Sequence, residues 1–118
     1  MAWQLASVVA GWRWRRRTTA ALAEHWRGAR AGDGASVVSL GNLYATGRGV
    51  SYDPHAAAQW YRKGAEAGDT DGMAALARCY ASGIGLSKDL AEARKWYDKP
   101  AAHGSDEAQA WLRPHPGP

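Results

Sequence analysis

Apolar residues between positions 33 and 46 recur at intervals of three and four, which is the period of one helix face. They are Val37, Leu40, Leu43 and Tyr44. Gly47-Arg48-Gly49 follows, and glycine readily adopts the left-handed conformation that closes a helix. The pattern therefore predicts a first helix that ends at a glycine turn.

A second helix is predicted directly after this turn. Asp53 is a preferred N-cap residue, and Pro54 behind it is favoured at the first helical position. The helical pattern then runs to Ala67 and stops at Gly68, and Asp69 is placed to cap the next helix. Each unit is therefore expected to be a helix, a Gly-Xaa-Gly turn, a second helix and a glycine turn.

The same pattern returns 36 positions later. Tyr44, Gly47, Gly49, Asp53, Ala57, Trp60 and Tyr61 match Tyr80, Gly83, Gly85, Asp89, Ala93, Trp96 and Tyr97. We assign structural roles to these residues: the glycines form turns, the aspartates cap helices, the alanines allow close packing, and the aromatic residues fill the core. One helical hairpin cannot bury its apolar face alone, whereas stacked hairpins can.

The offset extends beyond the two matched units. It predicts a Trp- and Arg-rich N-terminal segment over 1–17, a repeat array over 18–112 and a Pro-rich tail over 113–118. Within the array, full units are expected at about 32–67 and 68–103, with a half unit at each end.

These residues resemble the Sel-one-like repeat (SLR), a longer-period relative of the tetratricopeptide repeat. The resemblance covers about residues 18–112 and implies an all-α fold, an α/α solenoid of helical hairpins wound into a right-handed superhelix. It also implies a scaffold for protein–protein contact, often found in bacterial signalling, envelope or host-interaction proteins. Gly64 and Pro100 stand where the family pattern has Ala, and Pro100 is expected to bend or weaken the end of its helix.

The formal net charge of +4 is concentrated at the N-terminus. Residues 1–31 hold six Arg and one Glu, whereas the rest of the chain holds 9 basic and 10 acidic residues. A specific nucleic-acid site on the repeats is therefore not expected. The basic segment 1–17 is either a leading helix or frayed end, or an arm that contacts an anionic membrane or nucleic acid.

The compartment stays open, with the cytoplasm favoured. Segment 1–17 places its arginines after its apolar residues, the reverse of a secretory signal. No run of 18 apolar residues exists, so no transmembrane segment is expected.

The sequence offers no group of residues that predicts catalysis. The four histidines fall at different positions of the repeat, and Cys79 is the only cysteine. We therefore expect no enzyme, no metal and no cofactor. Some relatives with paired cysteines have been described as β-lactamases, but that activity accompanies a cysteine framework that a single Cys cannot form.

The variable positions of the first helices are the candidate binding surface. Val38, Asn42, Ala74 and Arg78 turn away from the repeated apolar stripe, and we expect them to line the concave face and to bind a protein or peptide. An ordinary solvated surface is the alternative. An incomplete array also exposes apolar ends, so self-association through Trp111 on the last helix is a further hypothesis.

Overall fold

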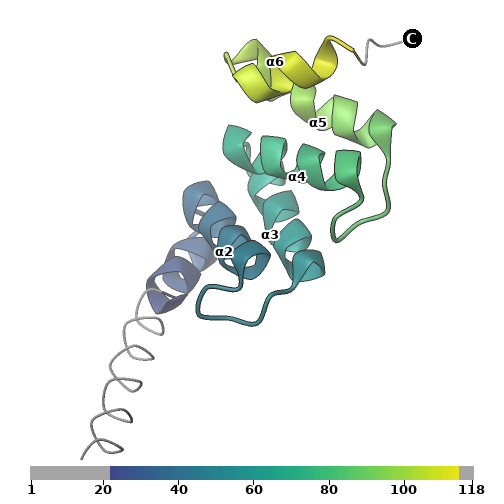
Figure 1. Cartoon of the computed structure of the whole chain (residues 1–118). Helices are drawn as coiled ribbons and strands as arrows, with labels where there is room; N and C mark the ends of the chain where they lie inside the picture. Colours follow the sequence, from purple (N-terminus) through teal and green to yellow (C-terminus); the bar gives the residue numbers. More distant parts are fainter. Residues whose placement is uncertain (1–21, 115–118) are drawn as a thin grey trace, which may run out of the picture.

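The computed structural model describes residues 22–114, which form helices and turns with no strand in that range. Residues 22–30 are helical and are followed by α2 (Gly34–Thr46), α3 (Pro54–Glu66), α4 (Thr70–Ser82), α5 (Leu90–Ala102) and α6 (Asp106–Leu112). The helices stack in chain order from α2 to α6 (Figure 1). Each hairpin packs on the next, as the 36-residue repeat predicts.

Capping side chains set the start of every labelled helix. The carboxylates or hydroxyl of Asp33, Asp53, Asp69, Asp89 and Ser105 each accept a hydrogen bond from a backbone N–H of the first turn. These N–H groups have no partner within the helix, so the caps satisfy them. The repeat thus encodes each helix start with a single polar residue.

Glycines close the first helix of each full unit. Gly47 and Gly83 follow α2 and α4 with φ of 70°. Gly85 has φ of 74°, and a Cβ placed on it would lie 2.1 Å from the carbonyl oxygen of Pro54. His55 Nδ1 lies 3.1 Å from the Gly85 carbonyl oxygen. The second Gly-Xaa-Gly turn therefore rests directly on the start of α3 in the preceding unit.

The core follows the repeated apolar positions. Leu40 and Leu76 are completely buried, and Tyr61 and Tyr97 are 7% and 1% exposed. One cluster joins α2, α3 and α4, and a second joins α4, α5 and α6 through Ala74, Ala77, Tyr97 and Ala108. Each cluster needs side chains from two successive units, so neither unit has a core of its own.

The expected disruption at Pro100 does not shorten its helix. Both α3 and α5 have 13 residues, although Pro100 lies in the last turn of α5. The proline ring is fully buried. The ring thus gains apolar contact, which opposes the loss of the hydrogen bond that proline cannot donate.

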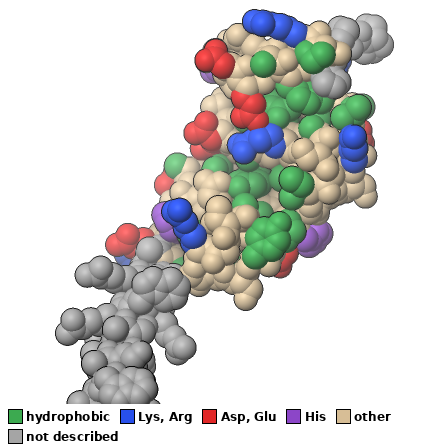
Figure 2. Space-filling model, in the orientation of Figure 1, with side chains coloured by type: hydrophobic (Ala, Val, Ile, Leu, Met, Phe, Trp, Pro, Cys, Tyr) green, Lys and Arg blue, Asp and Glu red, His purple; other side chains and the backbone are tan. Residues whose placement is uncertain are grey.

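Segment 1–17 and the last four residues of the predicted tail lie outside the described part of the chain. Within residues 22–114, no helix is both long and apolar enough to cross a membrane. On the face shown in Figure 2, acidic and basic side chains are interspersed. That face therefore carries no large field of a single charge sign.

Candidate interaction surface

Asn42 on α2 and Arg78 on α4 occupy equivalent positions of the two units, and both are exposed. The Tyr61 hydroxyl donates a hydrogen bond of 2.6 Å to Asn42 Oδ1. Since the amide oxygen is held by Tyr61, the amide nitrogen with its two N–H donors faces away from that contact. Asn42 is thereby oriented as a hydrogen-bond donor. We call the surface of α2 and α4 that carries Asn42 and Arg78 the first-helix face.

Arg78 is held by the next unit. Its Nε lies 2.8 Å from Oε1 of Glu107, and the same carboxylate oxygen accepts a hydrogen bond of 3.2 Å from the Tyr97 hydroxyl. The Arg78 side chain nevertheless stays 60% exposed. The first-helix face thus presents an oriented amide and an oriented guanidinium at matching repeat positions.

Three titratable groups beneath this face are neutral near pH 7: Tyr61, Cys79 and Tyr97. Burial raises the pKa of Tyr97 and Tyr61, and the negative charge of Glu107 raises that of Tyr97 further. Burial also raises the pKa of the Cys79 thiol, while the neighbouring Arg78 opposes this shift. A buried thiol that holds its proton is a poor nucleophile. Cys79 is buried and acts as a small apolar side chain of the core.

Val38 and Ala74 differ from the expected open surface. They are only 9% and 8% exposed, because each packs against the following unit rather than facing solvent. A Cβ placed on Gly72 of α4 would lie 3.1 Å from Val38 Cγ2, and Ala74 shares a cluster with Ala108 of α6. Their predicted exposure is corrected; of the four positions, only Asn42 and Arg78 reach the surface.

Trp111 also differs from the exposed anchor that the sequence suggests. It is half-buried, and its ring lies 5.0 Å from that of Tyr97. The last helix therefore uses Trp111 to cover the second unit. Self-association through this end of the array stays a prediction.

Two histidines within the described range make local contacts. His103 Nδ1 lies 2.9 Å from the carbonyl oxygen of Lys99, and His55 contacts Gly85 as described above. Among residues 22–114, no group of three or more His, Cys, Asp or Glu side chains is arranged to hold a metal ion.

The family follows from comparison with known proteins. A model of the Sel1 repeat matches residues 36–69 and again residues 70–105, together more than half of the chain. The chain belongs to the Sel1 repeat family. Sel1 repeat proteins are scaffolds for protein–protein interaction, and the family is generally non-catalytic. The predicted resemblance and the predicted all-α solenoid are both confirmed.

Solved structures of Sel1 repeat proteins show the same fold, and these relatives are bacterial. A Sel1 repeat protein from Oxalobacter formigenes is 37% identical, with a TM-score of 0.73, over 76% of this chain and 68% of that one. Cysteine-rich protein B of Helicobacter pylori is 28% identical, with a TM-score of 0.73, over 77% and 68%.

A third structure is a protective antigen of uropathogenic Escherichia coli strains that displays an SLR fold. It is 35% identical, with a TM-score of 0.75, but the match covers 77% of this chain and only 20% of the antigen. A comparison with curated proteins gave no match.

Sequence reasoning missed the contacts that orient the exposed side chains. The bond from Tyr61 to Asn42 joins residues 19 positions apart, and the Arg78–Glu107 pair joins two units. The available signal was the shared offset: Tyr97 and Arg78 lie 36 positions after Tyr61 and Asn42. The two pairs make different contacts, because Tyr61 bonds Asn42 directly whereas Tyr97 and Arg78 both contact the Glu107 carboxylate.

Proposed function

We propose that this Sel1 repeat protein binds an extended segment of a partner protein across the first-helix face, with Asn42 and Arg78 as donors. The observation that carries the proposal is the hydrogen bond from Tyr61 to Asn42 Oδ1, which engages the amide oxygen of an exposed residue and leaves its N–H groups for a partner. A partner's backbone carbonyl or carboxylate oxygens are the matching acceptors. No bond of the partner is made or broken in this function.

The packing of the first helices against each other supports this choice of face. The first helices α2 and α4 approach each other directly across the unit boundary, through Val38 and Gly72. In a curved solenoid the helices on the inner side lie closest together, and the concave surface is the usual binding surface. This argument favours the first helices as the inner layer.

The spacing of the two donors suits an extended chain. Adjacent packed helices lie about 8–10 Å apart. An extended chain rises about 3.3 Å per residue, so this distance corresponds to roughly three residues of bound peptide. Asn42 and Arg78 would therefore contact acceptors about three residues apart on the partner.

The test is a quantitative pull-down with the full chain from an extract of the cells that produce it. The double variant Asn42→Ala and Arg78→Ala should lose its partner at least about tenfold, because two oriented hydrogen bonds are removed. The matched control is Gln59→Ala with Lys95→Ala, which removes an exposed amide and an exposed cation 36 positions apart on the second helices. Equal capture by both double variants and by the natural protein would refute this binding face.

A further inference from the structure

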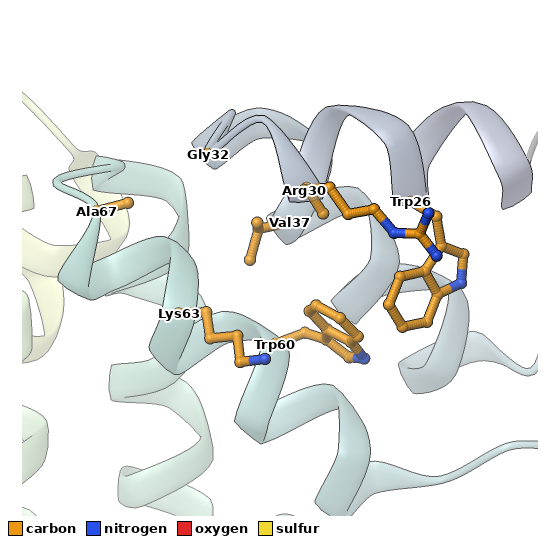
Figure 3. A pocket seen from close by; sticks show the side chains of 8 residues that line it. Trp26, Arg30, Gly32, Val37, Trp60, Lys63 and Ala67 are labelled. Carbon is orange, nitrogen blue, oxygen red and sulfur yellow. The ribbon is translucent and has the colours of Figure 1, made fainter.

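A cavity of about 340 Å³ lies between the helical segment 22–30 and α3, and neither Asn42 nor Arg78 lines it. Trp26 and Trp60 form its aromatic walls, Val37 of α2 lies beside them, and Arg30 and Lys63 supply two cations (Figure 3). The cavity is formed by three successive helices of the array. It therefore belongs to the packing of the first full unit on the half unit before it.

The aromatic walls are held in a defined geometry. The rings of Trp26 and Trp60 meet edge to face, with centroids 4.9 Å apart and an interplanar angle of 87°. Lys63 Nζ lies 4.6 Å from the centroid of the Trp60 ring. A cation over an aromatic face is electrostatically favourable, so Trp60 positions the Lys63 ammonium group. Arg30 is exposed and reaches toward Trp26 in Figure 3.

In the next unit, side chains fill the space that corresponds to this cavity. We call the open cavity the first groove and the filled space of the next unit the second groove. Met73 takes the place of Val37, 36 positions later, and is buried in a cluster against which Trp96 packs. Methionine is longer than valine and fills irregular gaps. The short Val37 side chain is therefore one reason why the first groove stays open.

The charge of the two grooves differs as well. Glu66 takes the place of Arg30, and Arg62 takes the place of Trp26. Arg62 is engaged within the protein, since its Nη2 donates a hydrogen bond of 2.5 Å to the Tyr80 hydroxyl. Lys99 is the counterpart of Lys63. The first groove alone thus combines an open aromatic cavity with two cations at repeat positions.

We propose that this cavity binds an acidic peptide segment in which a carboxylate adjoins a large apolar side chain. A volume of about 340 Å³ is at the lower end for ligand sites and suits one or two side chains. The Arg30 guanidinium matches a carboxylate with two parallel hydrogen bonds, and Lys63 adds a second positive charge. Two cations are few for a nucleic acid, which is held through many phosphate contacts.

The experiment selects a displayed library of random 12-residue peptides on the full chain and measures the enriched peptides by fluorescence polarisation. The expected peptides carry a carboxylate next to a large apolar residue. The carboxylate can come from Asp or Glu or from the peptide's C-terminus. Replacing Asp and Glu by Asn and Gln, and separately amidating the C-terminus, distinguishes these two sources.

Two variants give this cavity the character of the second groove. Val37→Met fills the space and Arg30→Glu reverses the charge, and each should weaken binding at least about tenfold. The matched control is Met73→Val, at the position of the second groove that is equivalent to Val37. It should leave the affinity for the enriched peptides unchanged. The Asn42→Ala and Arg78→Ala double variant should also bind normally, which separates this site from the first-helix face.

Circular dichroism of each variant shows whether it folds. If Val37→Met does not fold, the binding measured with Arg30→Glu decides the result. The proposal is overturned if no peptide is enriched, if the enriched peptides lack carboxylates, or if Val37→Met and Arg30→Glu bind as the natural chain does. It is also overturned if an oligothymidine of 20 nucleotides binds the chain, loses affinity in Val37→Met and Arg30→Glu, and peptides do not bind.

Discussion

At the scale of single residues, the two full units fill the same contact between helices with side chains of different size. Val38 packs against Gly64 and Gly72, and a Cβ placed on Gly64 would lie 2.8 Å from Val38 Cγ2. In the second unit the equivalent positions are Ala74, Pro100 and Ala108, and all three are buried. A large residue beside two glycines is thus replaced by a small residue beside two larger ones. This exchange explains why the family's alanine is absent at Gly64.

Gly64→Ala should therefore destabilise the protein although alanine is the better helix former. Overpacking costs about 1–3 kcal/mol, which over most of this range exceeds the gain of at most about 1 kcal/mol in helix propensity. Adding Val38→Ala to the same chain should relieve the clash. Urea unfolding of both single variants and the double variant measures the coupling between the two sites. Strictly additive changes in the free energy of unfolding would show that the two side chains do not compete for space.

Tyr97 should make the protein sensitive to alkaline pH. Its pKa is raised from the ordinary value of 10.0 by burial and by Glu107, so the unfolded phenol ionises at lower pH than the folded one. The contribution to stability is full below pH 10.0 and shrinks as the pH rises above it. Cys79 has the same sign, starting from an ordinary value of 9.0.

Tyr97→Phe is the matched variant for this pH dependence. We expect the free energy of unfolding of the natural protein to fall above about pH 9, and that of Tyr97→Phe to fall less steeply. Urea unfolding at half-unit steps of pH measures both slopes. Parallel curves for the two proteins would mean that Tyr97 ionises equally easily in the folded and unfolded states.

At the scale of helices and turns, the sequence predicts most of the bounds correctly because single residues determine them. Aspartate or serine caps and closing glycines stand at the helix ends, and these signals are local. The exposure of Val38 and Ala74 was predicted wrongly for a different reason. A first helix contacts its own partner and also the first helix of the next unit. The apolar stripe visible in the sequence describes only one of these contacts.

The two glycines of the second turn should respond differently to the same substitution. Gly83 and Gly85 have similar φ angles of 70° and 74°, so alanine costs about 1–2 kcal/mol at either position through backbone strain. Only at Gly85 would the added Cβ also meet the backbone of Pro54, at 2.1 Å. Gly85→Ala should therefore be the more destabilising variant in thermal unfolding. Equal loss at both positions would show that the turn can move away from α3 without cost.

At the scale of the whole molecule, stability is expected to pass from unit to unit, since each buried cluster joins two neighbours. The candidate site follows the same rule: Tyr61 orients Asn42 within a unit, whereas Glu107 orients Arg78 from the next one. The sequence predicts the surface positions Asn42 and Arg78 from periodicity. It does not predict their orientation, because Asn42 depends on how the two helices of its unit pack and Arg78 depends on how the next unit is placed.

Trp111 tests this dependence at the end of the array. Its ring packs on Tyr97, and α6 provides Ala108 to the second cluster, so Trp111→Ala should loosen α5 and α6 more than α2 and α3. Hydrogen exchange of the full chain should show a protection loss of about tenfold or more in α5, because removing a half-buried tryptophan costs about 2 kcal/mol. Trp60→Ala is the matched control at the opposite end, where the loss should concentrate in residues 22–30 and α3. A uniform loss over all helices in both variants would instead show that the array unfolds cooperatively as a whole. The first-helix face and the cavity beside Trp60 would then form and unfold together.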